Sequence, residues 1–301
     1  MTHGHAFLPN TCHYTAHTAR GDYLVNVAWP LIWGEDRTPP EDEKHPLNVL
    51  YVVDGDVFFF TAVEITRRLE FTNNTRTIVV GVGYPRTKYV YDYRRGTDLT
   101  PPAADGKYQD PLGGDGKPIS GLVWGEGSKY LDNIENDIMP YVNSLFPNVP
   151  IKTSRTALYG HSFGGVFALN ALFTRPTLFD TVIAASPSIS WNHCSIVKEQ
   201  EAAFRALEKP VSPAPALIIT WGSIEDDVEK TPEMTDKEYE VAKLLAEDAN
   251  MRGYSLEMVE RLEKCPSIRS VFKWEFEGED HGDAAVVAIQ RGLRKFLVEK
   301  V

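Results

Sequence analysis

The sequence predicts an α/β fold, in which a mostly parallel central sheet has helices on both faces. Short apolar runs such as residues 47–53 are continuous and do not alternate with polar residues, which is typical of strands buried on both sides. These runs alternate along the chain with segments of helical periodicity, as parallel crossover connections require. The 301 residues show no internal repeat and no clear boundary, so we expect a single domain over residues 1–301.

Seven segments are predicted as strands because each is rich in apolar, β-branched or aromatic residues and is bounded by turn-forming ones. The first of them alternates in polarity, whereas the second and third are continuously apolar. We expect strands at residues 21–33, 47–53, 76–85, 156–160, 181–186, 216–222 and 270–278.

Helices are predicted between these strands from the spacing of their apolar residues. The helix over residues 128–146 contains Pro140, which is expected to kink or shorten it. Thr235 and Glu238 form a capping box, which marks the start of another helix. We expect helices at residues 57–71, at 128–146, directly after Ser162, at 239–253 and at 283–300.

Residues 96–127 differ from the rest of the chain. They hold eight glycines and four prolines and show little periodicity. A loop of this length inside a compact domain is usually functional or disordered. We therefore expect a long Gly/Pro-rich loop insertion here.

Composition and charge exclude several classes of protein. The net charge of −11 disfavours nucleic acid and anionic membranes as partners, and no apolar run is long enough to cross a bilayer. The N-terminal residues lack the pattern of a signal peptide. Cys12, Cys194 and Cys265 are too few and too scattered for a disulfide framework or a zinc cluster. We expect a soluble, cytoplasmic protein with reduced thiols.

A candidate nucleophile lies in the stretch Gly160-His161-Ser162-Phe163-Gly164, which fits the pattern G-x-S-x-G. A predicted strand precedes it and a predicted helix follows it, as this motif requires. Such a tight turn needs glycine at the flanking positions. It exposes the Ser162 hydroxyl and aims the Phe163 N–H toward the carbonyl under attack. The alternative is a glycine-rich turn that contains an uninvolved serine.

A base must take the proton from that hydroxyl, and the motif's usual order along the chain is serine, acid, histidine. Only His193 and His281 follow Ser162. His193 comes just after the next strand, whereas His281 lies between the last strand and the last helix, where the base is expected. We therefore assign His281 as the base, the alternative being a surface histidine.

The acid of the triad is expected after the strand at residues 216–222, where Glu225, Asp226 and Asp227 follow in succession. Glu225 stands third after the strand's terminal glycine, in the position that many α/β-hydrolases give their acid, and we favour it. Asp226 and Asp227 remain alternatives. The acid would fix the tautomer of His281 and stabilise its protonated form.

A second oxyanion donor is expected from the turn after an early strand. The stretch Val53-Asp54-Gly55-Asp56 offers the N–H of Gly55 or Asp56, and Asp54 would fix the turn. The alternative is a plain turn at the end of a strand.

Several motifs resemble the "putative esterase" branch of the α/β-hydrolases, and most closely the siderophore esterases. The resemblance covers most of the chain from about residue 22. GHSFGG and GEDHGD are shared across a broad family, whereas YDYRRGTDLTP and SPSISW are more specific to siderophore esterases. The other motifs that carry it are LYVVDGD and VGVGYP.

The resemblance implies a serine hydrolase that opens ester bonds of a ferric siderophore inside the cell. Such a hydrolase is expected to need no metal or organic cofactor of its own. Any iron arrives with the substrate. Arg95 and Asp98 fall on the group's R-x-x-D-x-T-P pattern and are expected to border the cleft or else to anchor the loop as a salt bridge. Trp191 and Trp124 are expected to line the pocket or to belong to the core.

Charge favours one class of siderophore within this group. A ferric tris-catecholate is strongly anionic and a ferric tris-hydroxamate is neutral, so a chain at −11 disfavours the first unless a basic cleft compensates. Only a thin basic cluster is available, formed by Lys88, Arg94, Arg95 and Lys107. We therefore expect a hydroxamate ester of the fusarinine type, such as triacetylfusarinine C.

Two alternatives stay open, because a fold does not fix a substrate. The same triad would serve hydrolysis or acyl transfer of another small ester or thioester. A non-catalytic siderophore carrier of the same fold is the other alternative, which the intact pair of Ser162 and His281 disfavours.

Overall fold

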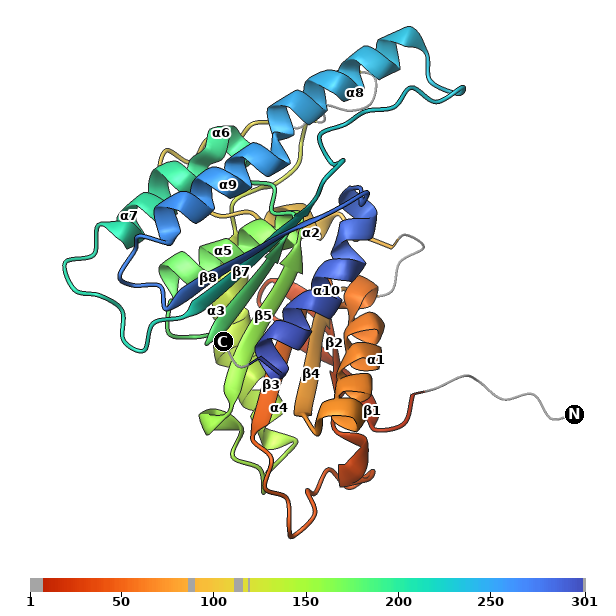
Figure 1. The fold of residues 1–301 in the computed structure, drawn as a ribbon, viewed down its shortest axis with the longest axis vertical. Helices are drawn as coiled ribbons and strands as arrows, with labels where there is room; N and C mark the ends of the chain where they lie inside the picture. The colour runs from red at the N-terminus through yellow and green to blue at the C-terminus, as the bar shows by residue number, and fades with distance from the viewer. Residues whose placement is uncertain (1–7, 86–89, 111–115, 119, 300–301) are drawn as a thin grey trace, which may run out of the picture.

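A single eight-stranded sheet runs through the protein, whose structure is a computed structural model describing residues 8–85, 90–110, 116–118 and 120–299 (Figure 1). The strand order is β1-β2-β4-β3-β5-β6-β7-β8. β2 pairs antiparallel with β1 and β4, and all other neighbours are parallel. The strands are β1 Thr11–Thr18, β2 Gly21–Ala28, β3 Leu47–Val53, β4 Arg76–Gly83, β5 Arg155–His161, β6 Thr181–Ala185, β7 Ala216–Gly222 and β8 Ser270–Phe276.

Helices connect the parallel strands. The α-helices are α1 Gly55–Asn73, α2 Arg94–Leu99, α3 Gly127–Asn133, α4 Met139–Ser144, α5 Phe163–Thr174, α6 Trp191–Ile196, α7 Ala202–Arg205, α8 Asp236–Ala249, α9 Met251–Leu262 and α10 His281–Leu297. Two π-helical turns, η2 Ile134–Ile138 and η4 Val197–Glu201, join α3 to α4 and α6 to α7, and short 3-10 turns lie at Leu31–Trp33 and Ile151–Thr153.

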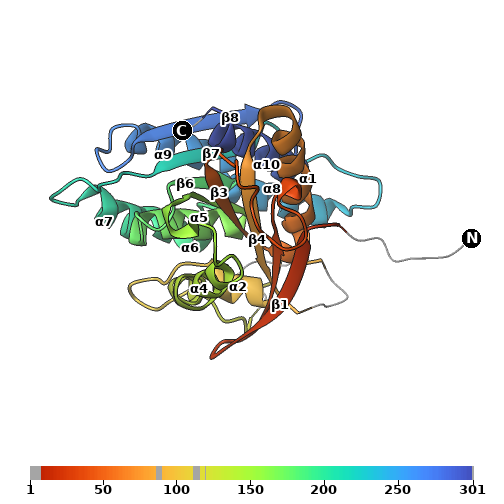
Figure 2. The same ribbon diagram turned by 90° about the horizontal axis from the view of Figure 1, so that it is seen from below.

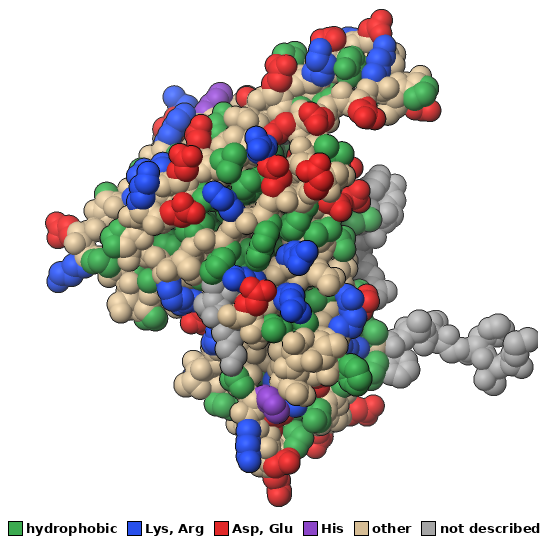
Figure 3. Space-filling model, viewed as in Figure 1, with side chains coloured by type: hydrophobic (Ala, Val, Ile, Leu, Met, Phe, Trp, Pro, Cys, Tyr) green, Lys and Arg blue, Asp and Glu red, His purple; other side chains and the backbone are tan. Residues whose placement is uncertain are grey.

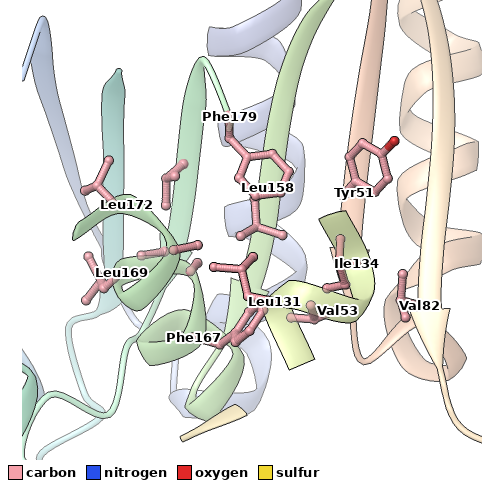
Figure 4. Close-up of a cluster of buried hydrophobic side chains, with 14 of the residues drawn as sticks. Tyr51, Val53, Val82, Leu131, Ile134, Leu158, Phe167, Leu169, Leu172 and Phe179 are labelled. Atoms are coloured by element: carbon pink, nitrogen blue, oxygen red, sulfur yellow. The ribbon is translucent and has the colours of Figure 1, made fainter. Parts of the chain in front are cut away.

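The central strands are continuously apolar because helices cover both faces of the sheet. In β3, Tyr51 and Val53 belong to one buried cluster, whereas Leu50 and Val52 belong to the other. Figure 4 shows side chains of α5 and η2, such as Phe167 and Ile134, beside Val53 in the first cluster. Alternate residues of one strand thus supply two cores.

Two layers of helices follow from this arrangement. α1 and α10 lie together on one face, and α3, α4, α5 and α9 cover the other (Figure 2). The expected fold class, a mostly parallel α/β sheet of the α/β-hydrolase type, is confirmed.

Four elements differ from the sequence expectation. The strand expected at residues 21–33 ends at Ala28, and a 3-10 turn follows at Leu31–Trp33. β1 was not predicted, because this edge strand is half exposed and largely polar. Pro140 does not end its helix, which continues to Ser144, but the turn before it widens to a π-helix, since proline offers no N–H and its ring crowds the carbonyl four residues earlier. The helix expected at residues 239–253 is broken at Asn250, whose φ of 35° is left-handed and separates α8 from α9.

The expected loop at residues 96–127 begins with α2 and ends at α3. Between them, the described residues 100–110, 116–118 and 120–126 contain no helix or extended strand, and residues 111–115 and 119 lie outside the described residues. Residues 1–7, the first part of the N-terminal stretch that lacks a signal-peptide pattern, also lie outside them. Within the described part of the chain, no helix is long and apolar enough to span a membrane.

The parallel strands all end at the same edge of the sheet, so the turns that follow β3, β5, β7 and β8 meet there. α8 projects beyond this edge as an arm (Figure 1) and has no buried residue. Acidic and basic side chains are interspersed along this arm (Figure 3).

Candidate active site

The turn between β5 and α5 holds Ser162 in a strained conformation. Its φ of 60° and ψ of −119° are uncommon for a residue with a side chain. A Cβ on Gly160 would come within 2.0 Å of the Gly164 carbonyl oxygen, and one on Gly165 within 2.9 Å of the Ala185 oxygen. The sequence places glycine at these positions because the turn leaves no room for a side chain.

The Ser162 side chain lies at the surface of the turn and is half buried. Its Oγ lies 3.3 Å from Ser188 Oγ, and the Ser188 N–H also donates to the Ser162 carbonyl. In resting hydrolases the contact between nucleophile and base is often long and shortens when substrate binds. In this structure the side-chain partner of the Ser162 hydroxyl is Ser188, and among the described residues no hydrogen bond joins Ser162 to His281.

Glu225 and His281 form a direct pair at the ends of β7 and β8. Glu225 Oε2 lies 2.6 Å from His281 Nδ1, and the Glu225 side chain is only 2% exposed. Its other oxygen accepts hydrogen bonds from the Ser186 hydroxyl and the Gly222 N–H. A carboxylate held in this way can keep a proton on Nδ1 and leave Nε2 free to act as a base.

Contacts between two turns bring this pair together. The Ser223 N–H donates to the Phe276 carbonyl, and the Ile224 N–H donates to the Glu279 carbonyl. A Cβ on Gly222 would lie 2.1 Å from that Glu279 oxygen, so only glycine permits the approach. His281 then follows as the first residue of α10.

The alternatives for acid and base lie elsewhere. Asp226 accepts hydrogen bonds from the N–H groups of Met251 and Arg252 at the start of α9. His193 is exposed and lies in the left-handed turn of α6. Among the three acidic residues of this turn, Glu225 is the one paired with His281.

Two helix N-termini meet beside Ser162. Phe163 begins α5 and Gly55 begins α1, and the first N–H groups of a helix have no partner within it. A Cβ on Gly164 would lie 3.1 Å from Val53 Cγ2, which shows how closely the two turns approach. Asp54, with a φ of 50°, shapes the second turn, as expected of it. This arrangement suits an oxyanion formed by N–H groups of Phe163 and of Gly55 or Asp56.

Arg95 supports that turn. Its guanidinium donates two hydrogen bonds to the Asp54 carboxylate, at 3.1 and 2.9 Å, and lies over the Phe163 ring. The Asp54 side chain is 2% exposed and that of Arg95 16%. Arg95 therefore borders the site, but its charge is already neutralised.

A pocket of about 430 Å³ opens next to Ser188. Trp191 lines it, whereas Trp124 is buried behind it and contacts the rings of Trp191 and Phe163. Its walls come from the long loop, from the turns after β5 and β6, and from the α8 arm. The lining residues are Gln109, Asp110, Phe163, Ser188, Ser190, Trp191, Asn192, Leu244, Leu245, Asp248 and Ala249.

The remaining residues expected at the site lie outside this pocket. Asp98 is 2% exposed, and it pairs with Arg20 and accepts a hydrogen bond from the Tyr23 hydroxyl. This buried and paired position does not support a contact between Asp98 and the substrate. It does form a salt bridge near the long loop, although its partner is Arg20 and not Arg95.

Of the described members of the basic cluster, only Arg95 borders the site. Arg94 donates to the Asp22 carbonyl and lies over an aromatic ring, and Arg95 is committed to Asp54. Lys107 lines a neighbouring pocket, and Lys88 lies outside the described residues.

Sequence reasoning missed the residues that support the pair and the pocket. Ser186 and Ser188 both fall in the SPSISW motif, which carries the resemblance to siderophore esterases but predicts no role for either serine. Asn192 holds the long loop by bonding the Lys107 carbonyl and the Gln109 N–H, while Tyr108 stacks on Trp191. Only the motif offered a signal, because the loop contacts depend on tertiary structure.

Comparisons with known proteins identify the family of the chain. Residues 37–218 match the family described as "Putative esterase". The siderophore triacetylfusarinine C esterase of Aspergillus fumigatus is 36% identical over 96% of this chain and 94% of its own. The chain belongs to this esterase family.

Two further members extend the likeness. The siderophore enterobactin esterase of Emericella nidulans is 36% identical over 91% of this chain and 88% of its own. The solved structure of the siderophore hydrolase EstA from Aspergillus nidulans has a TM-score of 0.87 at 33% identity and covers 98% of both chains. The expected resemblance, and the expected class of carboxylic ester hydrolase, are therefore confirmed at the level of the family.

Proposed function

We propose that this esterase hydrolyses ester bonds of a ferric siderophore with Ser162, His281 and Glu225 as its triad. The bond of 2.6 Å between Glu225 and His281, at the edge where the Ser162 turn ends, is the observation that carries the proposal. The names of its relatives, a triacetylfusarinine C esterase and an enterobactin esterase, support the substrate class.

The first half of the proposed reaction forms an acyl-enzyme. His281 Nε2 takes the proton of Ser162 Oγ as that oxygen attacks the ester carbonyl carbon. N–H groups of Phe163 and of Gly55 or Asp56 stabilise the negative oxygen, each contributing about 3–4 kcal/mol. Protonated His281, stabilised by Glu225, then gives its proton to the leaving alcohol.

Water completes the reaction. His281 removes a proton from a water molecule, which attacks the acyl carbon, and the second tetrahedral intermediate collapses to release the carboxylic acid and restore Ser162. Ser188 is suited to hold the Ser162 hydroxyl between cycles, since their oxygens are 3.3 Å apart. Every step uses side chains, main-chain N–H groups and water, and iron enters as part of the substrate.

The charge of the pocket supports a hydroxamate substrate of the fusarinine type. Among the described residues that line it, Asp110 and Asp248 are the charged ones, and both are acidic. These carboxylates would repel a strongly anionic ferric tris-catecholate and would tolerate a neutral ferric tris-hydroxamate. The aromatic and aliphatic wall of Trp191, Phe163 and Leu245 suits the uncharged parts of such a molecule.

Replacing the nucleophile tests the mechanism. We predict that Ser162→Ala lowers the rate of ester hydrolysis by at least about a thousandfold, because no acyl-enzyme can form. The rate would be measured with a p-nitrophenyl ester and with ferric triacetylfusarinine C, and a fluorophosphonate should label only the unaltered protein. Full activity in this variant would overturn the proposed mechanism.

Product analysis tests the substrate. Mass spectrometry after incubation with ferric triacetylfusarinine C should reveal linear hydrolysed fragments. If that siderophore stays intact while a simple ester is cleaved, the alternative of another small ester or thioester replaces the siderophore in this proposal.

The site of action is proposed to be the cytoplasm. Cys12, Cys194 and Cys265 are all unpaired, which suits a reducing compartment. Fractionation of the producing cells with an antibody against the chain would test this placement.

A further inference from the structure

His161 is a buried imidazole that none of the proposed steps uses. It is the last residue of β5, directly before Ser162, and it is only 4% exposed. A buried polar ring loses its hydration and needs a hydrogen-bond partner inside the protein. The identity of that partner indicates what His161 does.

The partner of His161 is the main chain of His281. His161 Nε2 lies 2.8 Å from the His281 carbonyl oxygen. Because a carbonyl oxygen can only accept, Nε2 must carry the hydrogen. The two imidazole rings also touch, with their centres 4.5 Å apart, and Phe58 of α1 packs edge-on against His161 from another side.

The charge state of His161 suits this contact. Burial, with smaller contributions from His281 and Arg95, lowers the pKa of His161 to about 3. Arg95 is paired with Asp54, and His281 with Glu225. His161 is therefore neutral near pH 7 and places no positive charge beside His281 when that residue becomes protonated during catalysis.

We propose that His161 is a positioning residue, which holds the main chain of His281 against the nucleophile turn. This inference rests on the proposed function of Ser162 and His281. Glu225 fixes the tautomer and rotation of the His281 ring through Nδ1, whereas His161 fixes the residue's backbone from β5. The nucleophile and its base are thereby tied together through the residue that immediately precedes the nucleophile.

Three substitutions separate this role from simple packing. His161→Gln keeps a donor at about the position of Nε2, His161→Asn carries a donor too short to reach the carbonyl, and His161→Phe keeps a ring without a donor. A displaced base slows the reaction without changing substrate binding. We predict that the Asn and Phe variants lower kcat by about 10- to 100-fold with KM within about twofold, and that Gln stays within about fivefold of wild type.

The assay would use a p-nitrophenyl ester, with each rate divided by the folded fraction from circular dichroism. His17→Gln, on the exposed edge strand β1, serves as the matched histidine control. If the Phe variant does not fold, the comparison of Gln with Asn decides.

Equal kcat values for the Gln and Asn variants, or full activity in a folded Phe variant, would overturn the role of His161. That result leaves the proposed function intact as long as Ser162→Ala is inactive. Activity in Ser162→Ala would instead remove the proposed function itself, so the two failures are distinguishable.

Discussion

At the scale of single residues, Glu225 offers the sharpest test of the catalytic pair. Its Oε1 accepts from the Ser186 hydroxyl and the Gly222 N–H, so only a carbonyl oxygen can replace it on that side. In Glu225→Gln the amide NH₂ must then face His281 Nδ1 and force the proton onto Nε2, where the base is needed. We predict a fall in kcat of about 10³- to 10⁴-fold with KM little changed, measured by steady-state kinetics.

Asp226 is the matched control for that substitution, because it lies next in sequence and caps α9. Asp226→Asn should leave kcat unchanged and reduce the free energy of unfolding by no more than about 1 kcal/mol. If Asp226→Asn inactivated the enzyme and Glu225→Gln did not, the acid would have been assigned to the wrong residue.

These residues also show how far sequence alone reaches into the site. Ser162 and His281 could be assigned because a motif and the order along the chain single them out. Glu225 could only be favoured, since three acidic side chains share one turn and the turn's geometry decides which faces His281. His161 occupies the variable position of the motif, so no sequence pattern distinguishes it from a filler residue.

At the scale of elements, substitutions in the α8 arm can test substrate binding separately from stability. It has no buried residue, yet Leu244 and Leu245 line the pocket. We predict that Leu244→Ser raises KM for ferric triacetylfusarinine C by about fivefold, through lost apolar contact, and leaves the melting temperature unchanged. Steady-state kinetics and a thermal melt measure the two effects.

Leu207 provides the control, because it is also an exposed leucine and lies outside the pocket. Leu207→Ser should change neither KM nor the melting temperature. An equal rise in KM for a small p-nitrophenyl ester in the Leu244 variant would count against a specific contact between α8 and the siderophore.

The burial of each element determines whether the sequence could predict it. β3 and β4 were predictable because both their faces are buried, which makes them continuously apolar. β1 was not, since an edge strand needs few apolar residues. The division between α8 and α9 depends on one left-handed residue, Asn250, inside a segment that otherwise has helical periodicity.

At the scale of the whole molecule, net charge and pocket charge have the same sign. The chain carries −11, and Asp110 and Asp248 line the pocket. We predict that raising NaCl from about 20 to 300 mM increases kcat/KM for a ferric tris-catecholate severalfold, because salt screens the repulsion. For a neutral ferric tris-hydroxamate the change should stay below about twofold.

Competition kinetics at the two salt concentrations measure this difference directly. A similar response from both siderophores would mean that charge does not select the substrate.

At Ser162, the stability of the fold and the catalytic activity favour different residues. A chain shaped only by folding would place glycine there, because a residue without Cβ adopts a φ of 60° freely. Laboratory evolution that selects for heat tolerance alone would therefore favour glycine at this position, and the selected protein would lack the nucleophile. A useful screen has to score turnover and thermal tolerance together.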